Sequence, residues 1–257
     1  MICLEYINGV DTAQKLTKAN AEALADCGIQ FVGRYLVPQY YSKSLTESEA
    51  DAIRSAGLGI VLIYEIEAAR AKRGEEVGYS DGQEAKYLAE RLGVPSDAAI
   101  YFCVDYDAPK TDYPAIERYI YLAKHGCAPY KCGLYGKADL INSVKADCYM
   151  QCVAWSYNVV SNKTNIYQYD WQGGAEAQAI QKATGIPVDM DRCWDMRAAG
   201  IWMPPEQKHW YDDAMKWAAE NGLMNDGRPE DYITRAEVAT VLQRYDELLH
   251  EAVKPNE

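Results

Sequence analysis

Two acidic tripeptides follow apolar, strand-like runs, and their carboxylates could perform acid–base chemistry. Asp105-Tyr106-Asp107 follows residues 99–104, and Asp189-Met190-Asp191 follows residues 186–188. Because residues i and i+2 of a strand face the same side, each tripeptide directs two carboxylates one way. Like charges held near apolar residues are costly unless they are paired, hydrated or partly protonated. The tripeptides therefore predict a site for acid–base chemistry.

The overall charge limits the partners of the chain. The 257 residues carry a formal net charge of −12, which disfavours nucleic acid and anionic membrane lipid because both need a positive surface. A neutral or cationic partner such as a glycan fits better. No run reaches the roughly 20 apolar residues of a membrane span. The N-terminus also lacks a basic region followed by an apolar stretch, so we expect synthesis in the cytoplasm without a visible signal peptide.

Eight cysteines and three histidines bear on metal and nucleophile chemistry. Cys103, Cys132 and Cys152 lie in apolar strand-like runs, so we expect buried thiols rather than structural disulfides. Without a CxxC pair, and with few histidines, a zinc site and a Ser-His triad are poorly supported. We expect neither a metal nor another cofactor. A cysteine–histidine wall amidase or peptidase stays open as a minor alternative, because it needs one cysteine beside a base such as His125.

Eight strand-like runs alternate with helical patterns over about the first 195 residues. This alternation predicts an α/β fold, a compact (β/α)8 TIM-like barrel over residues 1–199. The later connections are short, so we expect reduced or irregular helices there. The predicted strands are 6–11, 30–36, 59–65, 99–105, 131–135, 151–155, 165–169 and 187–191.

The barrel prediction gathers polar residues at one end, because catalytic groups in this fold project from the C-terminal ends of the strands. For any single polar residue at this end, the alternative to a catalytic role is a helix cap or a salt bridge at the rim of the barrel. With 21 Tyr against 2 Phe, most aromatic rings carry a polar group, which suits a wet cleft that stacks on sugars. The expected catalytic residues are Asp11, Glu65, Asp105, Asp107 and Asp189, and the expected substrate-binding residues are Arg34, Tyr35, Tyr64, Tyr135, Trp155, Gln168 and Asp191.

Several short motifs resemble those of a known family. Gly9-Val10-Asp11, Phe31-Val32-Gly33-Arg34-Tyr35 and the stretches 45–53, 100–107 and 188–191 are similar to glycoside-hydrolase-like barrels of the DUF1906 type. Those barrels are relatives of the family 25 lysozymes, and the resemblance covers about residues 5 to 195. It implies a cell-wall glycosidase. The lysozymes carry Asp-x-Glu at the fourth strand, and the N-acetyl group of the substrate is thought to act as nucleophile.

Glycoside hydrolysis needs an acid that protonates the leaving oxygen and a second group that stabilises or attacks the oxocarbenium-like centre. Asp107 stands where the lysozymes have glutamate, and its shorter side chain displaces the proton by about an ångström or more, to which catalysis is sensitive. Asp107 is the expected acid, Glu65 is the alternative, and a site without an acid is the third possibility. Asp105 would orient or stabilise, while Asp11 and Asp189 hold the sugar. Mutual repulsion should raise at least one pKa.

The composition changes after residue 200. Residues 200–208 are typical of a linker, and residues 209–257 form an expected all-α module of two helices joined by a loop. Its Ile233-Thr234-Arg235-Ala236-Glu237 motif is similar to one S-layer homology repeat, which implies attachment to a cell-wall polysaccharide. Thr234 and Glu237 form a capping box in any case. Arg235 is the expected wall anchor, because a helix N-terminus favours an anionic group.

Together these patterns predict a peptidoglycan glycoside hydrolase, muramidase-like or endolysin-like, that acts at the cell wall. The expected partners are peptidoglycan or another wall glycan, with a possible secondary cell-wall polymer for the C-terminal module. The alternative is a catalytically weak or inactive barrel that binds wall glycan. Such repeats usually occur in threes and one copy is visible here, which leaves independent binding by the module open.

Overall fold

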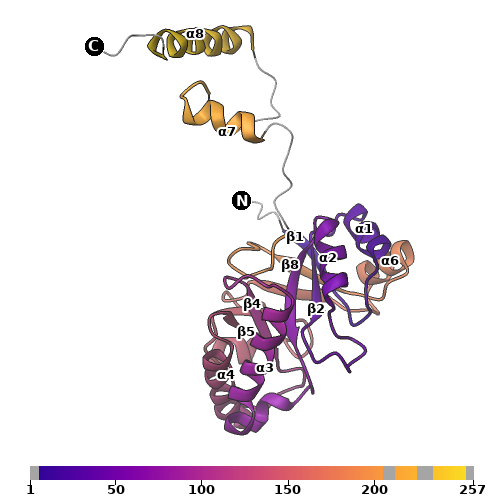
Figure 1. Cartoon of the computed structure of the whole chain (residues 1–257). Coiled ribbons are helices and arrows are strands. Elements are labelled where there is room, and N and C mark those ends of the chain that lie inside the picture. Colours follow the sequence, from indigo (N-terminus) through magenta and orange to yellow (C-terminus); the bar gives the residue numbers. More distant parts are fainter. Residues whose placement is uncertain (1–5, 205–211, 225–233, 253–257) are drawn as a thin grey trace. The chain divides into compact units, whose positions relative to one another are not determined.

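The computed structural model describes residues 6–204, 212–224 and 234–252 and divides the chain into two units, residues 1–205 and 206–257 (Figure 1). Part of the predicted linker, residues 205–208, lies outside the described residues. The same holds for the predicted loop around Asp226-Gly227. The two units are therefore treated separately below.

The first unit is a closed barrel whose eight strands follow one another in sequence order. The predicted α/β barrel is thereby confirmed, although the sixth strand lies three residues earlier than expected. We call the end at which β1 to β7 finish the mouth. The strands are β1 (Ile7–Asp11), β2 (Phe31–Tyr35), β3 (Gly59–Tyr64), β4 (Ala99–Cys103), β5 (Lys131–Gly136), β6 (Cys148–Cys152), β7 (Ile166–Asp170) and β8 (Asp189–Cys193).

The eighth strand runs antiparallel to both of its neighbours, whereas β1 to β7 pair in parallel. Asp189 opens β8 and pairs with Asp11 at the end of β1, while Cys193 pairs with Ile7. The chain approaches β8 from the mouth, where the Thr12 hydroxyl donates to the Pro187 carbonyl at 2.7 Å. The expectation that Asp189 and Asp191 close this strand is wrong. Asp189 reaches the mouth because β8 is reversed.

Helices cover the outside of the barrel (Figure 1). α3 and α4 pack closely, since an added Cβ at Gly82 would lie 2.4 Å from the Ala123 carbonyl oxygen. The expected reduction of the late helices holds for α5, which has six residues, and for β6, which joins β7 without a helix, but not for α6, which has ten residues. The helices are α1 (Lys18–Asp26), α2 (Glu47–Ser55), α3 (Gly78–Arg91), α4 (Tyr113–Cys127), α5 (Ala138–Ser143) and α6 (Ala175–Thr184), with 3-10 turns η1 (Arg70–Glu76) and η2 (Lys110–Asp112).

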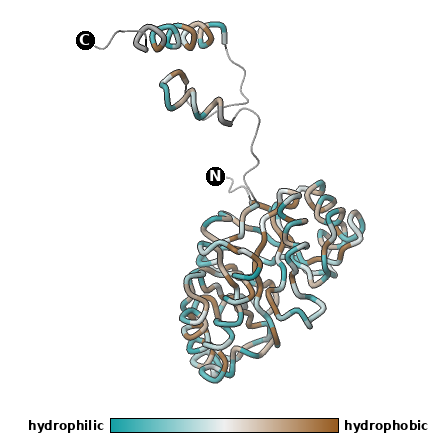
Figure 2. The backbone as a smooth tube through the Cα atoms, viewed as in Figure 1, coloured by the Kyte–Doolittle hydropathy of each residue, from teal (hydrophilic) through white to brown (hydrophobic). Residues whose placement is uncertain are grey.

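Alternate strand residues build two apolar layers, and Figure 2 shows hydrophobic segments, in brown, within the barrel. Outward residues such as Val32 and Leu62 pack beneath the helices. Inward residues such as Phe31 and Tyr101 fill the barrel, and their rings occupy the space beside Gly9 and Gly133. Since the barrel interior is packed, polar inward side chains gather at the mouth.

After β8 the chain lies across the opposite end of the barrel from the mouth. Trp202 pairs with Ile60 near the start of β3, and the Ala99 amide at the start of β4 donates to the Gly200 carbonyl at 2.7 Å. The guanidinium of Arg54 lies 4.5 Å from the Trp202 ring centroid. Strand β1 therefore begins, and the described residues that follow β8 end, at the same side of the barrel, away from the mouth.

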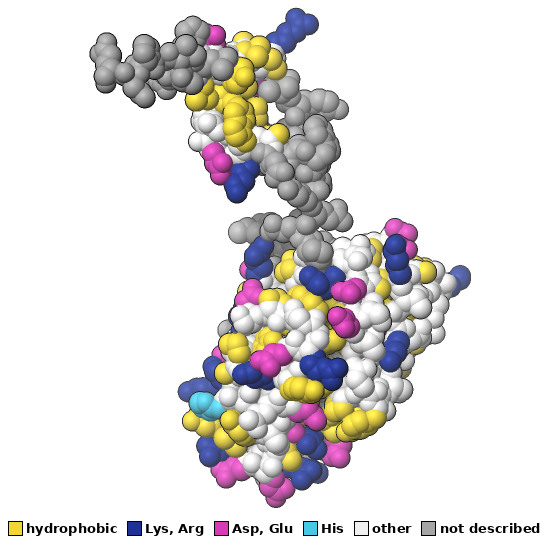
Figure 3. Space-filling view, viewed as in Figure 1, with side chains coloured by type: hydrophobic (Ala, Val, Ile, Leu, Met, Phe, Trp, Pro, Cys, Tyr) yellow, Lys and Arg dark blue, Asp and Glu magenta, His cyan; other side chains and the backbone are white. Residues whose placement is uncertain are grey.

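The second unit contains α7 (Asp212–Glu220) and α8 (Arg235–Ala252). Thr234 and Glu237 form the predicted capping box, with the Glu237 amide 3.2 Å from the Thr234 hydroxyl and the Thr234 amide 2.8 Å from the Glu237 carboxylate. Exposed apolar side chains, among them Trp217 and Leu242, gather on this unit (Figure 3). None of the helices in the described ranges is long and apolar enough to cross a membrane.

Candidate functional site

Four carboxylates meet at the mouth of the barrel. Asp11 ends β1, Asp189 opens β8, and Glu65 and Asp105 follow β3 and β4. Their negative charges act on one another: Asp189, Asp105 and Glu65 all raise the pKa of Asp11, and Glu65 and Asp189 raise that of Asp105. The structure thus brings together four of the five expected catalytic residues.

A buried glutamine ties two of these carboxylates together. Gln168 Nε2 donates to Asp11 Oδ2 at 2.7 Å and, more weakly, to Asp189 Oδ2 at 3.4 Å. The hydroxyl of Tyr135 donates to Gln168 Oε1 at 3.0 Å, and the backbone amide of Gln172 donates to Asp189 Oδ1 at 2.7 Å. Both Gln168 and Tyr135, expected to bind substrate, therefore hold the carboxylates in fixed orientations.

The environment of the mouth favours protonated carboxyl groups. Burial, followed by the charge of Asp189, raises the pKa of Asp11 to about 8. Burial and the nearby Glu65 likewise raise the pKa of Asp105, which is only half-buried. A carboxyl that stays protonated near neutral pH can donate a proton to a leaving group. Asp105 combines a raised pKa with access from solvent.

Asp191 lies one layer deeper in the barrel, opposite Gly9 and Gln168. It is fully buried, and neither carboxylate oxygen has a hydrogen-bond partner among the described residues. Burial, with the charges of Asp11 and Asp189, raises its pKa well above the usual value. The expectation that Asp191 contacts the substrate is wrong, because its side chain is buried. This burial follows from the reversed direction of β8.

Lys43 is a site residue that the sequence patterns did not indicate. Its Nζ lies 2.6 Å from Glu65 Oε2 and 4.0 Å from the ring centroid of Tyr35. Tyr35, an expected substrate-binding residue, thus borders the cluster, and burial raises its pKa. The feature of the sequence that could have indicated Lys43 is its position in the long loop after β2, since such loops build the functional end of barrels.

Asp107 has different surroundings from the other carboxylates. Its side chain is half exposed and forms an ion pair with Lys137, the residue before α5. The charges that act most strongly on Asp105 come instead from Glu65, Lys43 and Asp189. Asp107 lies near the mouth in sequence, but its closest charged partner belongs to the β5–α5 connection.

Arg34, an expected substrate-binding residue, points to the helical side of the barrel wall. It is fully buried and donates from Nε to Glu49 Oε1 at 2.7 Å and from a terminal nitrogen to the Lys43 carbonyl at 3.1 Å. Its other terminal nitrogen donates to the Thr12 carbonyl. These contacts join α2 to the loops after β1 and β2, so the structure assigns Arg34 to the scaffold of the mouth.

The expected aromatic residues divide between the scaffold and the rim. Tyr64 is buried under α3, where its hydroxyl donates to Glu84 Oε2 at 2.7 Å, so it does not face the mouth. Trp155, after β6, is half-buried and adopts a positive φ of 55°. Trp171, which the sequence analysis missed, is 64% exposed and precedes Gln172, the residue bound to Asp189. Trp155 and Trp171 are available for stacking on a sugar.

The cysteines do not favour the cysteine–histidine alternative. The seven cysteines that the structure describes are free, and burial raises the pKa of Cys103 and Cys152, which disfavours the nucleophilic thiolate. His125 lies on α4 with its ring 4.6 Å from that of Tyr121. Within the described ranges, no group of three or more His, Cys, Asp or Glu residues could hold a metal ion.

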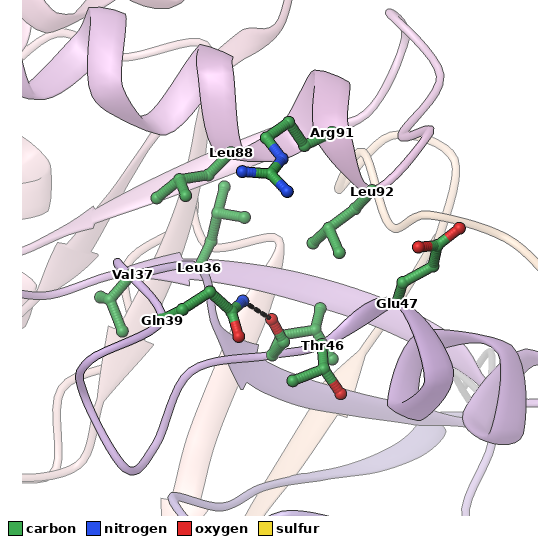
Figure 4. A pocket seen from close by; sticks show the side chains of 9 residues that line it. Leu36, Val37, Gln39, Thr46, Glu47, Leu88, Arg91 and Leu92 are labelled. Carbon is green, nitrogen blue, oxygen red and sulfur yellow. Dashed lines mark hydrogen bonds between the residues drawn. The ribbon is translucent and has the colours of Figure 1, made fainter.

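A cavity of about 250 Å³ lies in the outer wall, between the loop after β2 and the end of α3 (Figure 4). Leu36, Leu88 and Leu92 line it, and the Arg91 side chain lies at its edge. None of the mouth carboxylates lines this cavity. The candidate site is therefore the mouth rather than this cavity.

We expect Gly33→Ala to disturb Asp11, because an added Cβ would lie 2.6 Å from the Asp11 Cβ. Overpacking of this kind costs about 1–3 kcal/mol, measurable by thermal unfolding. Asp11→Gly removes the opposing Cβ, so Gly33→Ala should lower the stability by a smaller amount when Asp11→Gly is also present. An equal loss in both backgrounds would exclude this contact as the cause.

Comparison with known proteins relates the barrel to a family. The model of the Rv2525c-like, glycoside hydrolase-like domain matches residues 22–194, and that of the S-layer homology domain matches residues 206–239. Two uncharacterized Bacillus subtilis (strain 168) proteins, FadG and YbfG, are 31% identical over 106 residues and 33% identical over 117 residues. The matches cover 40% and 43% of this chain, which spans less than a fifth of either relative: 18% and 16%.

Solved structures show the same fold. The Tat-secreted protein Rv2525c of Mycobacterium tuberculosis, in complex with L-tartrate, has a TM-score of 0.65 at 19% identity, over 76% of this chain and 98% of that chain. An uncharacterized B. stearothermophilus protein has a TM-score of 0.53 at 20% identity, over 76% and 100%. The family match spans most of the barrel and confirms the resemblance carried by the motifs. The chain therefore belongs to the Rv2525c-like glycoside hydrolase-like family and carries an S-layer homology domain.

Proposed function

We propose that the barrel hydrolyses a glycosidic bond of cell-wall peptidoglycan, as a muramidase or endolysin does, with the mouth carboxylates as its catalytic groups. The observation that carries this proposal is the carboxyl of Asp105, which is half-buried, accessible and has a raised pKa beside other acidic groups. A proton donor and ionised carboxylates in one cleft are the groups that glycoside hydrolysis requires.

Asp105 is the proposed proton donor. Asp107, the acid predicted from the sequence, is half exposed and its carboxylate is engaged by Lys137. Asp107 therefore stays the second candidate. Asp189 is half-buried and joined to the buried Asp11 through Gln168, and it is the carboxylate proposed to accept hydrogen bonds from sugar hydroxyls.

A wall glycan fits the remaining features of the chain. The net charge of −12 favours a neutral or cationic partner over a polyanion, and Trp155 and Trp171 offer rings at the mouth. The S-layer homology domain supports action at the cell wall, with a secondary cell-wall polymer as its partner. The related Rv2525c fold belongs to a Tat-secreted protein, which is consistent with that location.

The second candidate function is glycan binding without turnover. It is favoured by Asp107, where the lysozymes have glutamate, and by the ion pair that engages this residue. A barrel of this kind would bind walls through the mouth and would leave the glycan intact.

Incubation with purified bacterial walls separates the two functions. A hydrolase should release reducing ends, and mass spectrometry of the soluble fragments should identify the bond that is cleaved. Sedimentation with walls from several species, without any release, would instead support the binding function and would exclude the proposed hydrolysis of those walls.

For the C-terminal unit, we expect Arg235→Ala to weaken sedimentation with walls, because Arg235 is exposed at the N-terminus of α8 and presents a cation to an anionic polymer. Lys216→Ala is the matched control, since it removes one exposed positive charge from α7. Thr234→Ala should instead lower the stability of this unit by about 1 kcal/mol through loss of the cap. Equal binding by Arg235→Ala and the unaltered protein would reject Arg235 as the anchor.

A further inference from the structure

Lys43 places a positive charge inside the acidic mouth. Its ammonium group is 2.6 Å from Glu65 Oε2, and both side chains are largely buried, at 23% and 14% exposure. The ammonium also lies over the Tyr35 ring, 4.0 Å from the centroid. An ion pair that is shielded from solvent and held on an aromatic ring is stronger than a surface pair.

The loop that carries Lys43 is fixed by buried contacts. The Lys43 carbonyl accepts a hydrogen bond from Arg34, which in turn binds Glu49 on α2. The next residues continue the support: Ser44 forms a bridge with Tyr35, and the Leu45 amide donates to the Tyr35 carbonyl at 2.8 Å. The position of the ammonium is thus set by the scaffold rather than by a mobile loop.

We propose that Lys43 is a positioning residue: its ammonium group fixes the carboxylate of Glu65 at the mouth and sets the charge that surrounds Asp105, the proposed proton donor. This inference rests on the proposed glycosidase function and adds a role for Glu65, that of the anion which stabilises positive charge at the sugar. Because Oε2 of Glu65 is engaged by the ammonium group of Lys43, the acid role is assigned to Asp105 rather than to Glu65.

The surroundings of Asp105 make the effect of Lys43 measurable. Lys43 is the positive charge that lowers the pKa of Asp105, against burial and the charges of Glu65 and Asp189, and the nearby hydroxyl of Tyr135 lowers it as well. Loss of Lys43 should therefore raise the pKa of Asp105. The other ionisable groups that Asp105 influences are Asp11 on β1, Tyr35 on β2, Cys103 on β4 and Cys152 on β6.

The test compares Lys43→Met with Lys43→Arg and with Lys86→Met, which removes an exposed positive charge from α3. Carboxyl ¹³C NMR of the full chain should show the Asp105 titration midpoint at higher pH in Lys43→Met only. Glu65→Gln removes a negative charge and should move the midpoint to lower pH. This second variant decides the question if Lys43→Met does not fold.

Turnover gives an independent readout on wall glycan. Lys43→Met should lower kcat by about tenfold or more through misplacement of Glu65, with little change in KM, and Lys43→Arg should restore much of it. The basic limb of the pH profile should move to higher pH, since Asp105 stays protonated longer. An unchanged Asp105 midpoint in both Lys43→Met and Glu65→Gln overturns the inference. A shifted midpoint in a protein without turnover rejects only the proposed hydrolysis.

Discussion

Asp105→Asn should reduce hydrolysis of natural wall glycan by about 100-fold or more, because asparagine keeps the side-chain volume but donates no acidic proton. The loss should depend on the leaving group. An aryl glycoside departs with little protonation, so its hydrolysis should fall far less. Initial rates on both substrates, measured across pH, give this comparison.

Two further variants decide between the carboxylates. Glu65→Gln should depress both substrates alike, because it removes a charge that stabilises the transition state rather than a proton donor. Asp107→Asn removes the partner of Lys137 and should show no dependence on the leaving group. If Asp107→Asn gives the leaving-group-dependent loss while Asp105→Asn does not, the acid is Asp107, as its alignment with the lysozyme glutamate predicts.

The stability of the barrel should fall as the pH rises from about 4 to 8, and Asp11→Asn should reduce this fall. The pKa of Asp11 in the folded protein is about 8, against an ordinary value of 3.8. The folded state thus keeps a proton that the unfolded chain has already released between these values. The stabilisation is full below the lower value and is lost as the pH rises through the higher one.

Asparagine at position 11 can still accept the hydrogen bond from Gln168 but never ionises. The melting temperature of Asp11→Asn at pH 8 should therefore exceed that of the unaltered protein, and a gain of about 2 kcal/mol corresponds to roughly 4–8 °C in a domain of this size. Asp97→Asn, on the exposed surface, is the control and should leave the slope unchanged. If the melting temperatures of Asp11→Asn and the unaltered protein changed with pH in parallel, Asp11 would not be the group that causes the fall in stability.

Much of the barrel could be predicted from sequence because its strands alternate between the barrel interior and the helical layer. The eight runs and their order follow from that alternation, and the gathering of Asp11, Glu65 and Asp105 at one end follows from the shared direction of β1, β3 and β4. The direction of β8 does not follow from this alternation. An apolar run has the same pattern in either direction, so only the tertiary path through Pro187 reveals that Asp191 lies inside the barrel.

The remaining errors in the site have two physical origins. Arg34 and Tyr64 lie near the C-terminal ends of their strands, yet their positions alternate with inward residues such as Tyr35, so they face the helices. Lys43 and Trp171 were missed because they lie in loops, where no periodicity indicates which residue returns to the mouth. Their roles depend on contacts with Glu65 and with the segment bound to Asp189.

The path of the chain after β8 has a consequence for modular evolution and for engineering. Gly200 and Trp202 lie against the starts of β4 and β3, at the end where β1 also begins. A gene fusion or domain exchange at either junction therefore alters none of the carboxylates at the mouth. Recombination could replace the anchoring module while preserving the chemistry of the barrel, and a designer could retarget the same barrel to another surface by grafting a different C-terminal binding domain.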